Sequence, residues 1–137
     1  AKAGLIEAGT YAELAHSKKV DAPFTIESPT LEGYLYPETY MVSPGRFTAK
    51  TFIERQLSMF QDRFLAQHTD GFGERSVHDL VVMGSMLERE EPKPKERPPV
   101  AGILWKRIDN GWQLGVDATS RYTLEDWNDF WSEYKNA

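Results

Sequence analysis

The sequence predicts an α+β fold, in which one predominantly helical domain also contains a few short strands. Several segments combine a capping residue with apolar residues three and four positions apart, a pattern typical of amphipathic helices. Two others, Leu31–Val42 and Trp112–Asp117, have the proline or the alternation typical of extended chain. The predicted order is a helix, an extended segment, three helices, a strand and a final helix. A chain of 137 residues is long enough to bury such a core.

Composition and charge exclude several classes of partner. The net charge is −5 without a basic cluster, which argues against nucleic acid or anionic lipid. Cysteine is absent and the histidines lack metal-ligand spacing, so we expect no metal and no cofactor. Ordinary surface or capping roles are expected for all three histidines: His16, His68 and His78. No apolar run is long enough to span a membrane. The chain begins at Ala1 without a methionine, so we expect a fragment of a longer protein.

The N-terminal third is predicted to contain one short helix and an extended segment. Thr10 and Glu13 have the spacing of a capping box, which opens the helix. Phe24–Ile26 is predicted to be a brief extended piece. Pro37 forbids a continuous helix and disfavours a central strand, so Leu31–Val42 is predicted to be an edge strand or a bent extended segment.

The longest predicted helix begins at Thr48 or Thr51 and ends near His68. Apolar residues three or four positions apart form its buried face: Ile53, Leu57, Phe60 and Phe64. The opposite face is expected to be exposed to solvent, with Glu54, Arg55, Gln56 and Asp62.

The most distinctive stretch is Ser76–Glu91. Ser76 and Asp79 are predicted to form a capping box, and Pro92 cannot continue the helix. Between these limits apolar residues surround most of the circumference, which predicts a buried helix. At about 100° per residue, Glu88 continues the most buried stripe.

Two interpretations of Glu88 remain open at this point. Charged residues at a helix end are usually solvated, and Glu88–Glu91 would then form an exposed face. Acidic groups in a last turn oppose the helix dipole, however, so they carry a small cost without structural return. Glu88 would otherwise be a half-buried carboxylic acid at a cleft edge, able to donate a proton near neutral pH. Gly84, one turn earlier, would let another chain or a sugar ring approach closely.

The C-terminal third is predicted to contain a helix, a strand and a final helix. Pro98 and Pro99 lie where a first helical turn tolerates proline, and Gly111 ends this helix. Its expected core residues are Val100, Ile103, Leu104 and Ile108. Apolar Trp112, Leu114 and Val116 then alternate with other residues, which predicts a half-buried strand. Asp117 is predicted to cap the following turn, and a last amphipathic helix is expected from Thr123.

Three blocks carry a resemblance that composition does not. They are LEGYLYPETY at Leu31–Tyr40, SMLEREEPKPKERPPVAGILWKRI at Ser85–Ile108 and NGWQLGVDATSRY at Asn110–Tyr122. In order and approximate spacing, these blocks resemble the endolytic murein transglycosylase family, also called the YceG-like family. The resemblance implies that residues 1–25 are an N-terminal helix and connection left from an upstream region. Residues 26–137 would be the YceG-like catalytic core, shortened at its C-terminus.

The resemblance also implies a reaction. Family members cut the glycan strands of peptidoglycan between N-acetylmuramic acid and N-acetylglucosamine, with the muramic C6 hydroxyl as nucleophile, and leave a 1,6-anhydro end. The family's catalytic glutamate falls on Glu88, as general acid and base. Substrate contacts are implied at Asp117 and Thr119, with Glu32 and Tyr40 as further candidates.

Two other functions remain as alternatives. The chain could be a non-catalytic glycan-binding or scaffolding module of the cell-wall synthesis machinery. It could also be a hydrolase that uses Glu88 and Asp117 as two carboxylates and leaves a reducing end. The resemblance further implies cell-wall synthesis proteins as partners. It implies a membrane anchor outside this chain, in the cytoplasmic membrane, with the domain on the cell-wall side.

Overall fold

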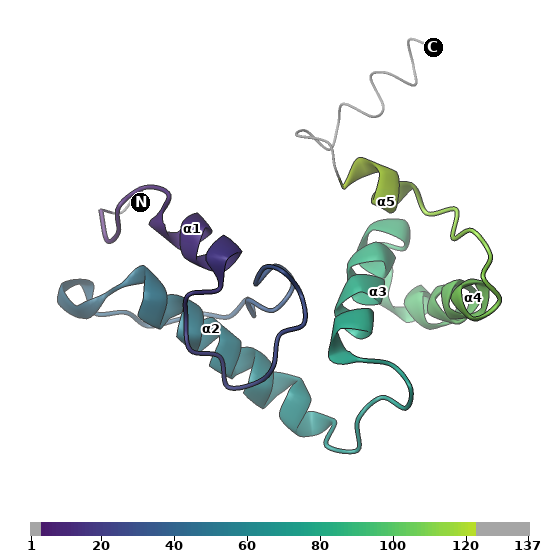
Figure 1. The fold of residues 1–137 in the computed structure, drawn as a ribbon, viewed down its shortest axis with the longest axis horizontal. Coiled ribbons are helices and arrows are strands. Elements are labelled where there is room, and N and C mark those ends of the chain that lie inside the picture. The colour runs from purple at the N-terminus through teal and green to yellow at the C-terminus, as the bar shows by residue number, and fades with distance from the viewer. Residues whose placement is uncertain (1–3, 123–137) are drawn as a thin grey trace, which may run out of the picture. The chain divides into compact units, whose positions relative to one another are not determined.

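A computed structural model describes residues 4–122 of the chain, and the regular elements of this part are helices joined by irregular segments (Figure 1). The α-helices are α1 (Thr10–Ser17), α2 (Ala49–Arg63), α3 (Val77–Glu90), α4 (Arg97–Asp109) and α5 (Asp117–Arg121). Three short 3₁₀ turns accompany them: η1 (Pro44–Arg46), η2 (Leu65–Gln67) and η3 (Pro94–Glu96). The chain divides into two compact units, one ending at Val81 and the other beginning at Val82.

The predicted α+β class is wrong, because residues 4–122 contain no β-strand. The chain turns tightly where the first strand was expected, and the backbone amide of Tyr34 donates to the carbonyl of Leu31 at 3.1 Å. In the second predicted strand, Val116 is locally extended, with φ −104° and ψ 113°. Its neighbours instead connect α4 to α5. Alternation predicts an extended backbone, but a sheet also needs a partner strand to complete its hydrogen bonds. The last predicted helix, from Thr123, lies outside the described residues.

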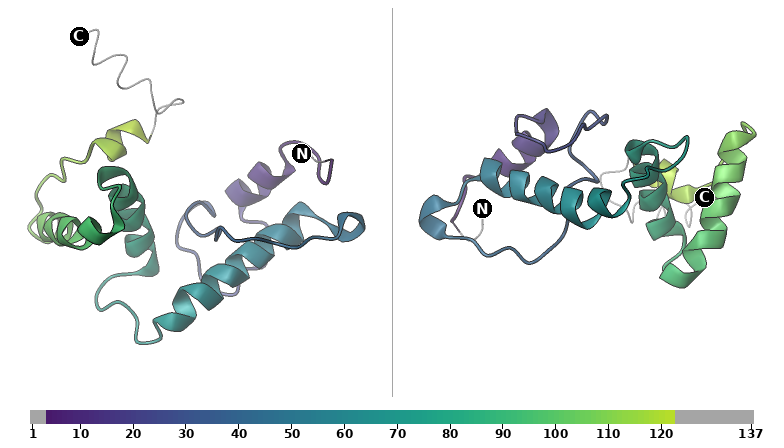
Figure 2. Two further views of the ribbon diagram at one scale, coloured as in Figure 1. Left: turned by 180° about the vertical axis from the view of Figure 1, so that it is seen from behind. Right: turned by 90° about the horizontal axis from the view of Figure 1, so that it is seen from below.

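The first unit is built around α2, against which α1 packs (Figure 2). Tyr11 of α1 donates a hydrogen bond from its hydroxyl to Oε1 of Gln56 at 2.5 Å, and its ring centroid lies 6.1 Å from that of Phe52. Gln56 is therefore buried, although the sequence places it on the exposed face of α2. The sequence pattern failed here because a polar residue was buried by pairing with a neighbouring helix.

The N-terminal cap of α2 agrees with the prediction, whereas that of α1 differs from it. Thr48 caps α2, since its Oγ1 accepts from the Thr51 amide at 3.1 Å. The Thr10–Glu13 capping box is wrong, because Gly9 is the N-cap of α1 and no side chain caps this helix. The regular helix α2 is also shorter than predicted, with η2 following it.

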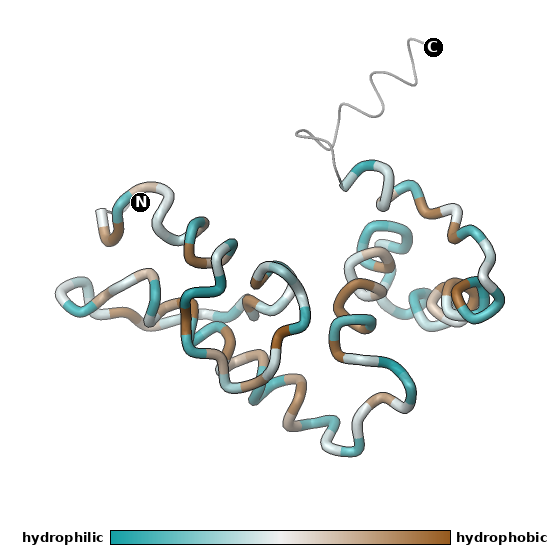
Figure 3. The backbone as a smooth tube through the Cα atoms, in the orientation of Figure 1, coloured by the Kyte–Doolittle hydropathy of each residue, from teal (hydrophilic) through white to brown (hydrophobic). Residues whose placement is uncertain are grey.

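The core of the first unit combines one face of α2 with the turn that precedes it. Hydrophobic and hydrophilic residues alternate along α2 (Figure 3). Its buried residues join two residues of the turn in a single cluster: Leu31, Tyr34, Ile53, Leu57 and Phe60. The predicted apolar face of α2 is thus largely confirmed, with Phe64 only partly buried at its end.

The second unit contains a smaller core formed by α3, α4 and α5. Its buried members are Met83, Met86, Leu104, Val116 and Ala118. In Figure 1, α3 lies in the plane of the picture, whereas α4 is seen nearly down its axis, so the two helices cross at a steep angle. Of the four core residues predicted on α4 only Leu104 is buried, whereas Ile103 is 56% exposed. No helix among residues 4–122 is long and apolar enough to cross a membrane.

Candidate functional site

Helix α3 positions Glu88, the residue that the sequence singles out. The predicted capping box is confirmed: the Ser76 amide donates to Oδ2 of Asp79 at 2.8 Å, and the Asp79 amide donates to Oγ of Ser76 at 3.0 Å. At the other end, the Glu91 amide donates to the Leu87 carbonyl at 2.9 Å. Both ends of the helix that presents Glu88 are thereby fixed.

The side chain of Glu88 is exposed in the structure. Helix α3 is not buried all round as predicted, because only Met83 and Met86 are fully buried and Val82 is 42% exposed. At about 100° per residue, Glu88 lies on the opposite side of the helix from the two methionines. Residues 4–122 therefore do not provide the half-buried environment expected for a catalytic acid, and the hydrophilic last turn of α3 is visible in Figure 3.

Arg97 holds the chain that leaves α3. Its guanidinium donates to the carbonyl of Glu91 at 2.9 Å and to that of Pro92 at 3.5 Å. Arg97 is also the first residue of α4, which therefore begins beside the end of the Glu88-bearing helix. Hydrogen bonds from one guanidinium to two carbonyls fix the direction of this connection.

The start of α5 places Asp117 and Thr119 in the same unit as Glu88. Both side chains are exposed, while their neighbours Val116 and Ala118 are buried in the core that also contains residues of α3. Thr119 is tied to its own turn, because its hydroxyl donates to the Val116 carbonyl at 2.7 Å. Val116 is the N-cap of α5, so the prediction that Asp117 is the cap is wrong by one position. As the first residue of the helix, Asp117 is favourably placed toward the helix dipole.

The connection between α4 and α5 is fastened by Arg107. Its guanidinium donates to the carbonyl of Leu114, and its own carbonyl accepts from the Trp112 amide at 2.8 Å. Gly115 has φ +64°, and a Cβ built on it would lie 3.2 Å from Nη1 of Arg107. Glycine is favoured there on both counts, since other residues rarely adopt that φ. This explains why the Asn110–Tyr122 block contains a glycine directly before Val116 and Asp117.

The remaining predicted site residues belong to the first unit. Glu32 is exposed, and its amide donates to Oγ1 of Thr30 at 3.3 Å. The Tyr40 hydroxyl donates to the Tyr36 carbonyl at 2.7 Å, and the Arg55 guanidinium lies 5.5 Å from the Tyr40 ring centre. Burial raises the pKa of Tyr40 above its usual value. Tyr40 is thus engaged in local packing and hydrogen bonding.

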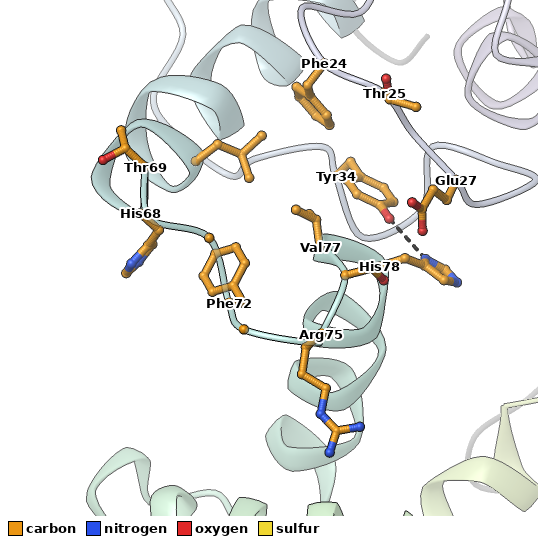
Figure 4. A pocket seen from close by; sticks show the side chains of 14 residues that line it. Phe24, Thr25, Glu27, Tyr34, His68, Thr69, Phe72, Arg75, Val77 and His78 are labelled. Atoms are coloured by element: carbon orange, nitrogen blue, oxygen red, sulfur yellow. Dashed lines mark hydrogen bonds between the residues drawn. The ribbon is translucent and has the colours of Figure 1, made fainter.

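A cavity in the first unit is the site that the sequence did not predict. It has a volume of about 540 Å³, and Figure 4 shows the side chains around it. In the wall of this cavity, the hydroxyl of Tyr34 lies 3.0 Å from Nδ1 of His78. Tyr34 is 1% exposed; burial raises its pKa above the usual value, and the Glu27 carboxylate raises it further. No periodicity could show this pairing, because 44 positions separate Tyr34 from His78.

Among residues 4–122, titratable groups do not gather into a metal centre. In the part of the chain that the structure describes, no group of three or more histidines and carboxylates could hold a metal ion.

The sequence model of the YceG-like family matches residues 3–136, and the chain belongs to this family. The endolytic murein transglycosylase of Streptococcus pneumoniae strain R6 is 27% identical over 84 residues, which cover 61% of this chain and 15% of that protein. The endolytic murein transglycosylase of Bacillus subtilis strain 168 is 26% identical over 95 residues, which cover 67% of this chain and 26% of that protein.

These matches limit what the comparisons say about the whole protein. The chain spans only 15% and 26% of the lengths of these two relatives. No solved structure matches the chain. The family is therefore established, and the reaction of this chain is a matter for proposal.

Proposed function

We propose that the chain is part of an endolytic lytic transglycosylase that cleaves peptidoglycan glycan strands between N-acetylmuramic acid and N-acetylglucosamine. The observation that supports this most is the family match over residues 3–136, together with relatives named endolytic murein transglycosylase. Glu88 is the proposed general acid and base. It lies in the last turns of a helix capped at its start and held by Arg97 at its end.

The proposed reaction needs one carboxyl group in two protonation states. The protonated Glu88 donates its proton to the glycosidic oxygen as the bond from muramic C1 breaks. The C6 hydroxyl oxygen of the same muramic residue then bonds to C1, and the Glu88 carboxylate takes the hydroxyl proton. No water is consumed, and Glu88 returns to its starting form. Because the nucleophile belongs to the substrate, its effective concentration is high and a second catalytic carboxylate is unnecessary.

Asp117 and Thr119 are proposed to contact the glycan in the second unit. Asp117 is exposed and anionic, so it can stabilise positive charge that develops on the sugar ring. Glu32 and Tyr40, in the first unit, are further proposed contacts. We also propose that the protein acts on the cell-wall side of the cytoplasmic membrane, where peptidoglycan lies, and that cell-wall synthesis proteins are its partners.

A digestion of purified peptidoglycan followed by mass spectrometry tests this proposal. The wild-type chain is expected to release 1,6-anhydro-muramyl ends, and Glu88→Gln is expected to release none. Glu90→Gln is the matched control, because it makes the same change two positions further along α3, where the side chain is also exposed. Equal amounts of anhydro ends from wild type and Glu88→Gln would refute the role of Glu88.

The exposure of Glu88 favours one second candidate function. A catalytic acid is usually kept partly desolvated, whereas Glu88 is exposed. A non-catalytic glycan-binding module needs no such acid. Binding of glycan strands by a folded chain that generates no new ends would support this second function.

A further inference from the structure

The proposed reaction leaves the cavity of the first unit without a role. None of Glu88, Asp117 and Thr119 lines it. Its volume of about 540 Å³ lies within the range of about 300–1,000 Å³ that small-ligand pockets usually have. All of its lining residues lie between positions 24 and 78, within a single compact unit.

The cavity has one apolar side and one polar side. Phe24, Leu65, Phe72 and Val77 supply the apolar side. At the other side, Glu27 lies beside the hydroxyl of Tyr34 and the imidazole of His78 (Figure 4). The Tyr34 hydroxyl lies 3.0 Å from Nδ1 of His78, and Figure 4 shows the other ring nitrogen of His78 turned away from the aromatic rings. The Glu27 carboxylate is a hydrogen-bond acceptor and lies across the cavity from the ring of Phe72.

Phe72 is held in place before any ligand arrives. Its ring is stacked on that of Phe64, with centroids 5.5 Å apart and planes 12° apart. The ring of His68 packs beside it at 5.3 Å. An aromatic face fixed by such neighbours costs little conformational entropy when a ligand packs on it.

The charges around the cavity favour an uncharged ligand. His68 and Arg75 also line the cavity, but Figure 4 shows the Arg75 guanidinium and the His68 ring pointing away from the Glu27 carboxylate. An anionic ligand would meet that carboxylate without a facing cation. A pyranose sugar fits better, because its hydroxyl groups bond to polar side chains while its C–H face packs on an aromatic ring.

We infer that this cavity binds an uncharged sugar ring of the glycan strand, the N-acetylglucosamine residue, between Phe72 and the Glu27 carboxylate. This inference rests on the proposed function, which makes the glycan strand the substrate. The muramic residue is disfavoured, because its lactyl carboxyl group carries either a negative charge or a bulky peptide. The first unit then holds the strand by a contact separate from the residues proposed for catalysis.

Amide NMR spectra of the 137-residue chain during titration with N-acetylglucosamine tetramer test the inference. Saturable shifts are expected for amides near the cavity, at positions 24–27 and 68–78. Phe72→Ala and Glu27→Ala are each expected to weaken binding about tenfold, by loss of an aromatic face or a charged hydrogen-bond acceptor. The matched controls are Phe47→Ala, outside the cavity, and Glu74→Ala, which removes the same charge beside the cavity without lining it.

Each result decides the inference. An absence of cavity shifts in the folded wild-type protein would overturn it, as would unchanged affinity in both Phe72→Ala and Glu27→Ala. If Phe72→Ala unfolds, a loss of amide chemical-shift dispersion will reveal it. The affinity of Glu27→Ala then decides the inference, because Glu27 is exposed and its replacement leaves the core intact. The proposed function is judged separately by anhydro ends: their formation without cavity binding would refute only this inference, and cavity binding without them would refute only the proposed reaction.

Discussion

Replacement of Gly33 by alanine tests the packing that joins the LEGYLYPETY turn to α3. Gly33 has φ +89°, and a Cβ added there would collide with Cγ1 of Val81. The left-handed backbone costs about 1–2 kcal/mol for a residue other than glycine. Overpacking adds about 1–3 kcal/mol. Val81 cannot easily rotate away, because a β-branched side chain in a helix has one strongly preferred rotamer.

The expected loss is therefore about 2–5 kcal/mol in the free energy of unfolding, measured by urea denaturation. Two control glycines separate the contributions. Gly71→Ala, at φ +72° with open space around it, should show only the backbone part, and Gly45→Ala should change stability by less than about 0.5 kcal/mol. In a Val81→Ala background, Gly33→Ala should lose only about 1–2 kcal/mol. An equal loss in both backgrounds would show that the collision with Val81 does not exist.

Three further predictions concern the first unit and the start of α3. Leu57→Ala should lower the free energy of unfolding by about 2–5 kcal/mol in denaturation experiments, because Leu57 is fully buried; a loss below about 1 kcal/mol would contradict this core. Tyr11→Phe should lose about 1–2 kcal/mol, since Gln56 is then buried without its partner, whereas Tyr36→Phe should be nearly neutral. The Ser76 amide lowers the pKa of Asp79 from its ordinary value of 3.8. The Asp79 carboxylate therefore stabilises the protein above pH 3.8, and this stabilisation is lost as the pH falls below that value. In Asp79→Asn, the melting temperature should depend less on pH in that acidic range than it does in the wild type. An unchanged pH dependence would argue against the capping box.

Local signals predicted the helices well. The Ser76–Asp79 capping box and the Thr48 cap depend on residues three apart, so short-range chemistry suffices to find them. The same holds for the prolines in the first turn of α4. A local signal did not suffice everywhere, because the Thr10–Glu13 box has the same spacing and is wrong: Gly9 is the N-cap of α1.

Tertiary context explains the failures. The strand predicted from Trp112 finds no partner strand among residues 4–122, and its backbone is instead anchored to Arg107 of α4. Glu88 was expected on a buried stripe, but the second unit buries the Met83–Met86 side of α3. Which side of an apolar helix becomes buried depends on its neighbours, and a sequence pattern does not specify them. The cavity at Tyr34 and His78 was missed because these two residues are 44 positions apart and only the tertiary fold brings them together.

The most direct measurement of the central claim is a digestion of peptidoglycan in water labelled with oxygen-18. An intramolecular attack by the muramic C6 hydroxyl consumes no water, so the new ends should be anhydro-muramyl ends without label. Their formation should stop in Glu88→Gln. Hydrolysis would instead place one labelled oxygen at each new reducing end. That result would contradict the transglycosylase account and make Asp117 the next residue to change.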